Sequence, residues 1–181
     1  MKTSNVLKLS IFSLLIMALI PVGIMAQDDD KSKLMNDANK AKEEFLKSDP
    51  LMKNLFDNSY GYVIFPNVGK GAVGVGGAAG HGIVYQQGNA IGMAKMKQLT
   101  IGVQLGGQAY REVIFFENKA AVDRFKGDNF ELSAQASAVA ATKGASADIK
   151  YRNGILIFTQ EKGGLMYEAS VGGQKFDYKA F

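Results

Sequence analysis

The stretch YGYVIFPNVGKGAVGVGG, residues 60–77, decides the fold of this chain. It opens with a compact apolar run from Tyr62 to Phe65 that is typical of a β-strand, and Pro66-Asn67 is predicted to end that strand. From Val68 to Gly77, glycine often takes alternate positions. Because strand side chains alternate between two faces, one face of the second strand is predicted to be nearly bare backbone.

The surroundings of this stretch are free of carboxylates. No Asp or Glu lies between Asn58 and Arg111, a segment that holds 13 of the 21 glycines. Such a composition is typical of a surface that does not repel an anion, and it offers no obvious acid–base pair. Its cationic or ionisable groups are Lys70, His81, Lys95 and Lys97, with Arg111 at its end.

The first 26 residues have the order of a secretory signal peptide. Lys2 and Lys8 precede an apolar run from Leu9 to Ala26, and acidic residues follow. We expect cleavage after Ala26 and export of residues 27–181 as one domain that is periplasmic, cell-envelope associated or secreted. A retained membrane anchor is the alternative. Cleavage would remove two lysines and lower the formal net charge from +4 to +2, which gives no indication of a nucleic-acid partner.

Helical periodicity precedes the strand-rich part. Leu34 to Phe45 carries apolar residues at spacings of three and four, and this helix is expected to end before Asp49 because Pro50 follows. The Asp49-Pro50 pair is predicted to start a second short helix. A third helix is predicted over Lys119 to Lys126, capped by Asn118.

Short apolar runs separated by turn residues fill the remainder. Gly82 to Met96 is predicted to be a hairpin with its turn at Gly88-Asn89, and Asn153-Gly154 predicts a second hairpin. Further strands are predicted at residues 99–105, 109–116, 130–140, 145–151, 155–159 and 165–171. Short links favour antiparallel pairing. The predicted fold class is therefore α+β, with a curved or nearly closed antiparallel sheet, N-terminal helices and one inserted helix.

Several classes of site find no support in the sequence. The chain has no cysteine, which excludes disulfides, thiolate metal sites and thiol nucleophiles. Residues 69–74 match the letters of a dinucleotide fingerprint, but more glycine follows instead of a helix. His81, the only histidine, is interpreted as a turn residue. It could join a catalytic triad only if the fold assembled one, and no serine lies in a G-x-S-x-G elbow. No metal, cofactor or enzymatic activity is expected.

Five blocks of the chain resemble the SYLF lipid-binding domain family, which bacterial exported proteins share with eukaryotic actin-patch regulators. The block at residues 60–71 is similar to the opening signature of that family, and the last block, residues 162–173, is similar to its end. The likeness covers about residues 34–178. The intermediate blocks are residues 100–108, 113–116 and 130–139.

The resemblance implies phospholipid binding without catalysis, and for an exported protein it implies anionic phospholipids or a buried acyl chain as ligands. It also implies a role for Lys70 in the opening block and Lys162 in the closing block. Together with Lys95 and Lys97, these lysines form the predicted lipid-binding set, and apolar faces around Phe65, Val73 and Val75 are expected to meet acyl groups. The alternative is a structural or protein-interaction component of the cell envelope, in which the glycine-rich surface packs in an oligomer or scaffold.

Overall fold

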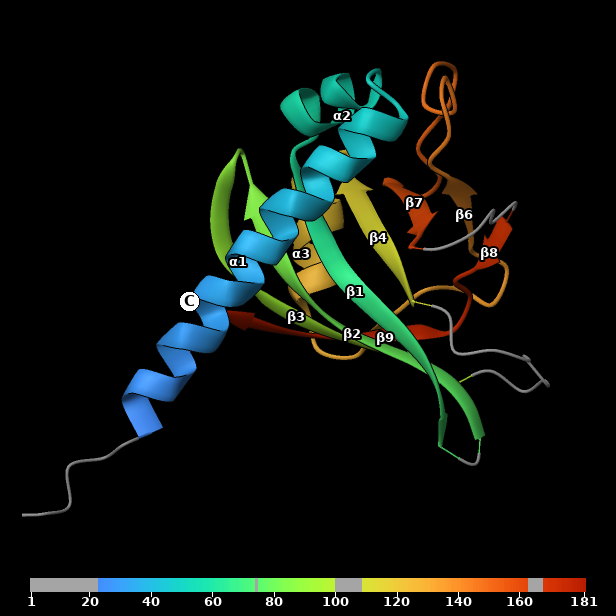
Figure 1. Cartoon of the computed structure of the whole chain (residues 1–181). Helices are drawn as coiled ribbons and strands as arrows, with labels where there is room; N and C mark the ends of the chain where they lie inside the picture. Colours follow the sequence, from blue (N-terminus) through green and yellow to red (C-terminus); the bar gives the residue numbers. More distant parts are fainter. Residues whose placement is uncertain (1–22, 74, 100–108, 163–167) are drawn as a thin grey trace, which may run out of the picture. The chain divides into compact units, whose positions relative to one another are not determined.

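The computed structural model of the protein describes residues 23–73, 75–99, 109–162 and 168–181 (Figure 1). The chain divides into two compact units, Met1–Lys33 and Leu34–Phe181. The second unit holds every described strand. The predicted strand at residues 99–105 lies largely outside the described residues.

Three helices are described. α1 (Gly23–Ser48) is followed directly by α2 (Met52–Asn58), and α3 (Lys119–Lys126) lies between two strands. Asn118 caps α3 as predicted, because its side-chain oxygen accepts a hydrogen bond of 3.0 Å from the Ala121 N–H. Within the described residues, no helix combines the length and the apolar composition that crossing a bilayer requires.

The described strands form one curled sheet of nine strands in the order β5-β9-β3-β2-β1-β4-β7-β6-β8 (Figure 1). All neighbours pair antiparallel except β6 and β7, which pair parallel. This confirms the predicted α+β class with a curved, predominantly antiparallel sheet. The strands are β1 (Gly61–Val73), β2 (Val75–Gln86), β3 (Asn89–Leu99), β4 (Ala109–Phe116), β5 (Phe130–Glu131), β6 (Ser137–Ala140), β7 (Ile155–Glu161), β8 (Glu168–Ser170) and β9 (Gln174–Ala180).

The segments next to the two edge strands, β5 and β8, run alongside each other. The Leu132 N–H donates to the Gln174 carbonyl at 2.9 Å, and the Gly173 N–H donates to the Leu132 carbonyl at 3.0 Å. The Ala134 carbonyl oxygen comes so close to Gly172 that a Cβ added there would lie 2.3 Å from it. The sheet is therefore a half-barrel whose open side is narrowed by these two connecting segments.

Both faces of the sheet are covered over part of their area, and each cover builds its own apolar core. On the α1 face, Phe45 of α1 and Phe56 of α2 pack with strand residues such as Tyr62 and Ile64. On the α3 face, Phe125 packs with residues that include Val63. Successive residues of the Tyr62–Phe65 run thus enter different cores. This explains why the run is continuously apolar rather than alternating.

A β-bulge at Pro66 changes the phase of β1 partway along its length. The pairing of β1 with β2 shifts between Ile64 and Asn67, and its pairing with β4 shifts between Phe65 and Val68. Proline has no N–H to donate to a ladder and is accommodated in sheets at such bulges. The prediction that the strand ends at Pro66-Asn67 was therefore wrong, because β1 continues to Val73.

Three other local predictions need correction. The turn between β2 and β3 is centred one residue earlier than predicted, since Gln87 and Gly88 have φ values of 50° and 80°. Residues 145–151 are irregular instead of a strand, although Asn153 and Gly154 do form the predicted turn, with φ values of 52° and 76°. The predicted strand at 130–140 is split into β5 and β6 by an irregular segment.

A buried carboxyl lies inside the half-barrel on the α3 face. Glu112 and Gln174 have no exposed surface, and Gln174 Nε2 donates a hydrogen bond of 2.9 Å to Glu112 Oε2. The Oε1 atoms of both side chains are buried without a hydrogen-bond donor. Burial raises the pKa of Glu112 to about 7, although the bond from Gln174 lowers it in part. Protonation of Glu112 would turn its carboxyl into a hydrogen-bond donor as well as an acceptor.

The first prediction concerns glycine in the sheet. A Cβ at position 82 would lie 2.6 Å from the Ile64 carbonyl oxygen and 2.8 Å from the Phe65 ring, whereas a Cβ at position 69 would meet no atom within 4 Å. Gly82→Ala should therefore lower the free energy of unfolding by about 2 kcal/mol through overpacking, and Gly69→Ala should change it by less than about 0.5 kcal/mol. Urea unfolding followed by circular dichroism measures both. Equal effects would contradict the close packing at Gly82.

The second prediction concerns pH. Because the pKa of Glu112 is raised above its unfolded value, the folded protein binds a proton that the unfolded chain releases between about pH 4.5 and 7. Its contribution to stability is therefore present at low pH and is lost as pH rises toward 7, at about 1.4 kcal/mol per pH unit. Glu112→Gln should remove this loss and make the variant the more stable protein at pH 8 by about 3 kcal/mol.

Urea unfolding at pH 5 and pH 8 tests this, with Glu117→Gln, a change at an exposed glutamate, as the control. The control should retain the pH dependence of the unaltered protein. A Glu112→Gln variant that loses as much stability as the unaltered protein between these pH values would show that Glu112 is ionised in the folded state.

Candidate functional site

Two of the four predicted lipid-binding lysines lie side by side on β3. Lys95 and Lys97 are both exposed, and because they are two residues apart they share the α1 face of the sheet. On β2 their register partners are His81 and Ala79, which are also exposed. His81 therefore lies in the middle of a strand, and its interpretation as a turn residue was wrong.

Lys162 joins the same face from the far side of β1. Its Nζ donates a hydrogen bond to Asn67 Oδ1. Asn67 pairs in register with His81, and His81 pairs with Lys95. Lys162 and Lys95 therefore belong to one row of polar residues across the sheet, with Asn67 and His81 between them. Partial desolvation lowers the pKa of Lys162, nearby Arg111 lowers it further, and Asp37 of α1 raises it.

The neighbouring strand β9 adds two lysines that the sequence analysis did not select. Lys175 pairs in register with Lys97, and Lys179 pairs with Met93, so both belong to the α1 face. Asp177, opposite Lys95, is a carboxylate in the same row. Lys175 also lies 3.5 Å from Glu131, in an exposed ion pair. The name basic surface is used below for His81, Lys95, Lys97, Lys162, Lys175 and Lys179.

The basic surface includes positions with little or no side chain. Gly69 pairs with Ala79, and both are exposed next to Lys97. Flat or bulky groups can therefore approach the backbone here. These positions agree with the nearly bare face that glycine alternation predicted, although the side chains of residues 70–76 of that stretch lie outside the described part.

Other parts of the predicted site are not brought together. Lys70 pairs in register with Ala78, which is one position along β2 from Ala79, the partner of Lys97. The side chains of Lys70, Val73 and Val75 lie outside the described part. Phe65 is fully buried in the core of the α3 face. The expectation that Phe65 meets acyl groups was therefore wrong, because covering of both faces leaves none of its ring at the surface.

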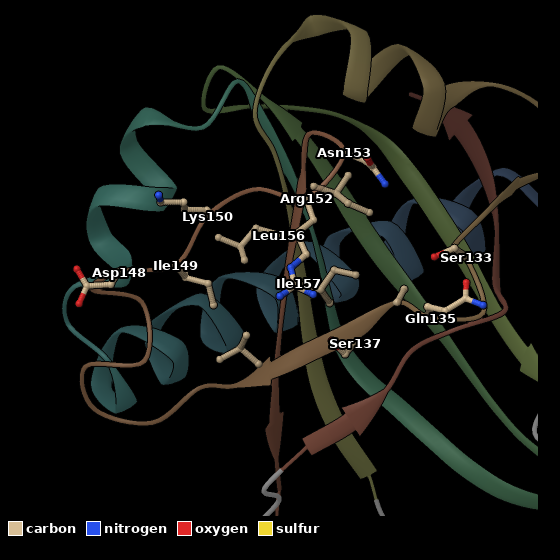
Figure 2. Close-up of a pocket in the computed structure, with 13 residues that line it drawn as sticks. Ser133, Gln135, Ser137, Asp148, Ile149, Lys150, Arg152, Asn153, Leu156 and Ile157 are labelled. Carbon is tan, nitrogen blue, oxygen red and sulfur yellow. The ribbon is translucent and has the colours of Figure 1, made fainter.

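The structure also contains a pocket of about 670 Å³ beside β6 and β7, near the β8 edge of the sheet (Figure 2). Its lining combines aliphatic side chains of β6 and β7 with residues 148–150, 152 and 153 of the irregular segment that precedes β7. Two cations, Lys150 and Arg152, and one carboxylate, Asp148, belong to that segment. The sequence analysis missed this pocket because it treated residues 145–151 as a strand. The only local signal was a pair of cations just before the Asn153-Gly154 turn.

Within the described residues, neither a metal centre nor a catalytic triad around His81 is assembled. No group of three His, Asp or Glu side chains in this part of the chain could hold a metal ion. The register neighbours of His81 are Asn67 and Lys95, which are neither a serine nucleophile nor an orienting carboxylate. These positions are suited to binding through charge.

Comparisons with known proteins agree with the resemblance seen in the sequence. Residues 97–179 match the sequence model of a family described as "Ysc84: Las17-binding protein actin regulator". The chain is also 30% identical over 128 residues to beta cell expansion factor A of Aeromonas veronii, an alignment that covers 70% of this chain and 49% of that protein. The chain thus spans about half the length of the curated relative that it matches.

The matched region contains most of the basic surface and the whole pocket, whereas residues 60–71 precede it. Neither the family description nor the name of the relative denotes an enzyme. The relative carries the same family, and membership supports a non-enzymatic binding domain. Residues 97–179 of this chain therefore belong to the Ysc84 (SYLF) family.

Proposed function

We propose that this protein is a non-enzymatic, exported lipid-binding protein whose basic surface associates with anionic phospholipid. One observation carries the proposal. Four exposed lysines lie on one face of two paired strands, β3 and β9, with Asp177 as the carboxylate among them. These lysines are Lys95, Lys97, Lys175 and Lys179.

The geometry of paired strands suits a headgroup layer. Neighbouring strands lie about 4.8 Å apart, so cations in adjacent rows can meet adjacent phosphates. Gly69 and Ala79 place no long side chain between Lys97 and an approaching membrane. Each lysine near an anionic membrane contributes about 1 kcal/mol, so the association should be weak and sensitive to salt.

The third prediction tests the basic surface by charge removal. The double substitution Lys95→Gln and Lys97→Gln should reduce partitioning onto vesicles that contain phosphatidylglycerol by about 30-fold, because it removes about 2 kcal/mol of attraction. Vesicle flotation at low salt measures the bound fraction. The unaltered protein should also be released as salt is raised, and it should not bind vesicles made of phosphatidylcholine alone.

The matched control removes two lysines elsewhere. Lys53 of α2 and Lys119 of α3 are exposed and each pairs with an aspartate on its own helix, so their replacement by glutamine gives the same net charge. This control should bind vesicles nearly as well as the unaltered protein. Equal losses in both double variants would indicate a net-charge effect without a defined surface. A salt-resistant oligomer without vesicle binding would favour the structural alternative.

The fourth prediction concerns export. We propose that residues 1–26 are removed as a signal peptide, on the evidence of the basic start and apolar run. Intact mass spectrometry of the protein from the extracytoplasmic fraction of cells that express the full chain should give a polypeptide that begins at Gln27. A chain that keeps Met1 and sediments with membranes would instead indicate an anchor.

A further inference from the structure

The pocket lies where β6 and β7 separate (Figure 2). β7 pairs with β4 along its whole length, but its register with β6 is limited to Phe158 and Thr159. The residues before Phe158 therefore have no β6 partner on that side. The pocket occupies this opening, and it lies apart from the basic surface in both strands and residues.

The opposite wall is irregular chain that is fixed by buried polar contacts. Asp49 has no exposed surface and accepts hydrogen bonds from Ser146 N and Oγ at 2.8 and 2.6 Å and from the Gly144 N–H at 3.2 Å. Burial opposes ionisation of Asp49, yet these bonds hold the pKa of its carboxyl below the ordinary value. Tyr151 adds a hydrogen bond of 2.7 Å to Ser59. The wall is thus pre-formed, which reduces the ordering cost of binding.

The lining of the pocket is amphipathic. Aliphatic side chains from three segments form its apolar part, and they suit an alkyl chain. They are Val139, Ile149, Ile155, Leu156 and Ile157.

The charges of the lining add up to one excess cation, since Asp148 offsets one of Lys150 and Arg152. In the described residues neither cation forms an ion pair. Figure 2 shows the side chain of Arg152 extending toward Ile157 and the middle of the pocket. A planar guanidinium there offers two parallel donors, which match a carboxylate group.

The peptide group of Ile157 faces the same opening. The Thr159 carbonyl accepts a hydrogen bond of 2.8 Å from the Ala141 N–H, so the backbone N–H and C=O of Thr159 face away from β4. In an antiparallel ladder this direction recurs every second residue. The N–H of Ile157 is therefore directed at the gap between β6 and β7, where it adds a polar donor next to the apolar lining.

We propose that this pocket binds one straight-chain alkyl carboxylate, with Arg152 holding the carboxylate and the aliphatic lining holding the chain. The single excess cation suits a monoanion, and a volume of about 670 Å³ lies within the roughly 300–1,000 Å³ of pockets that enclose small molecules. This site is separate from the basic surface. It takes a single amphiphile out of solution, whereas the basic surface meets a headgroup layer, so either can fail without the other.

The fifth prediction is a chain-length series. Titration calorimetry of the purified protein with octanoate, decanoate and dodecanoate, below their micelle concentrations, should show Kd falling about 15-fold for each pair of added methylenes, because each buried methylene contributes about 0.8 kcal/mol. Dodecyl phosphate and dodecanol are the headgroup comparators. Dodecanoate should bind most tightly of the three. A Kd that does not change with chain length would overturn the proposal.

Variants of exposed residues locate the site. Arg152→Gln should weaken dodecanoate binding at least tenfold and leave dodecanol binding unchanged, since only the anion needs the guanidinium. Ser137→Phe, which places a ring in the pocket from an exposed position of β6, should weaken both ligands. Circular dichroism checks that each variant is folded. Full dodecanoate binding by Arg152→Gln would refute the role of Arg152.

Lys97→Gln is the matched control, because it removes one exposed cation of the basic surface and leaves the pocket intact. Its dodecanoate Kd should equal that of the unaltered protein. In flotation the pattern should reverse, with Arg152→Gln binding vesicles normally. If Lys97→Gln weakens dodecanoate as much as Arg152→Gln does, the carboxylate binds at the basic surface and the pocket proposal fails.

Discussion

The whole structure depends on burial of both faces of the central strand β1. Its apolar run enters the core under α1 and α2 with one set of side chains and the core around α3 with the other. A strand that is buried on both sides tolerates little change in spacing, and this explains the close approach of Gly82 to the Phe65 ring. It also means that no large apolar side chain of this run remains at the surface to meet a ligand.

The bulge at Pro66 decides what each side of the sheet presents beyond the cores. After the bulge, Asn67 and Gly69 lie on the α1 face, where cations of β3 and β9 continue the rows. Val68 lies on the α3 face, whose interior holds Glu112 and Gln174. After this irregularity the α1 face is exposed and cationic, whereas the α3 face encloses a carboxyl whose pKa is raised by burial. The two sides differ in solvent access, and with it in the charge that they tolerate.

The pocket has a different origin. It exists because the sheet is incomplete where β6 and β7 separate, and because the segment before β7 folds back as an irregular wall tied to Asp49. Binding sites are commonly formed in this way, by irregular chain against a rigid edge. Lys150 and Arg152 are both exposed in that segment.

The sequence by itself determined the features that depend on near neighbours. Capping of α3 by Asn118, the turn at Asn153-Gly154, the bare row at Gly69 and the α+β class all follow from local side-chain chemistry and spacing. The family was also readable from ordered blocks of residues.

Only the tertiary structure decided which distant residues share a face or a core. Registry across strands and the phase change at Pro66 placed Lys162 in the row of Lys95 and assigned Lys70 to the other row. Long-range packing buried Phe65 and Glu112, and hydrogen bonds to Asp49 kept residues 144–146 out of the sheet. Such outcomes depend on pairing between segments far apart in the chain, and the residues within one segment do not specify which segment they will pair with.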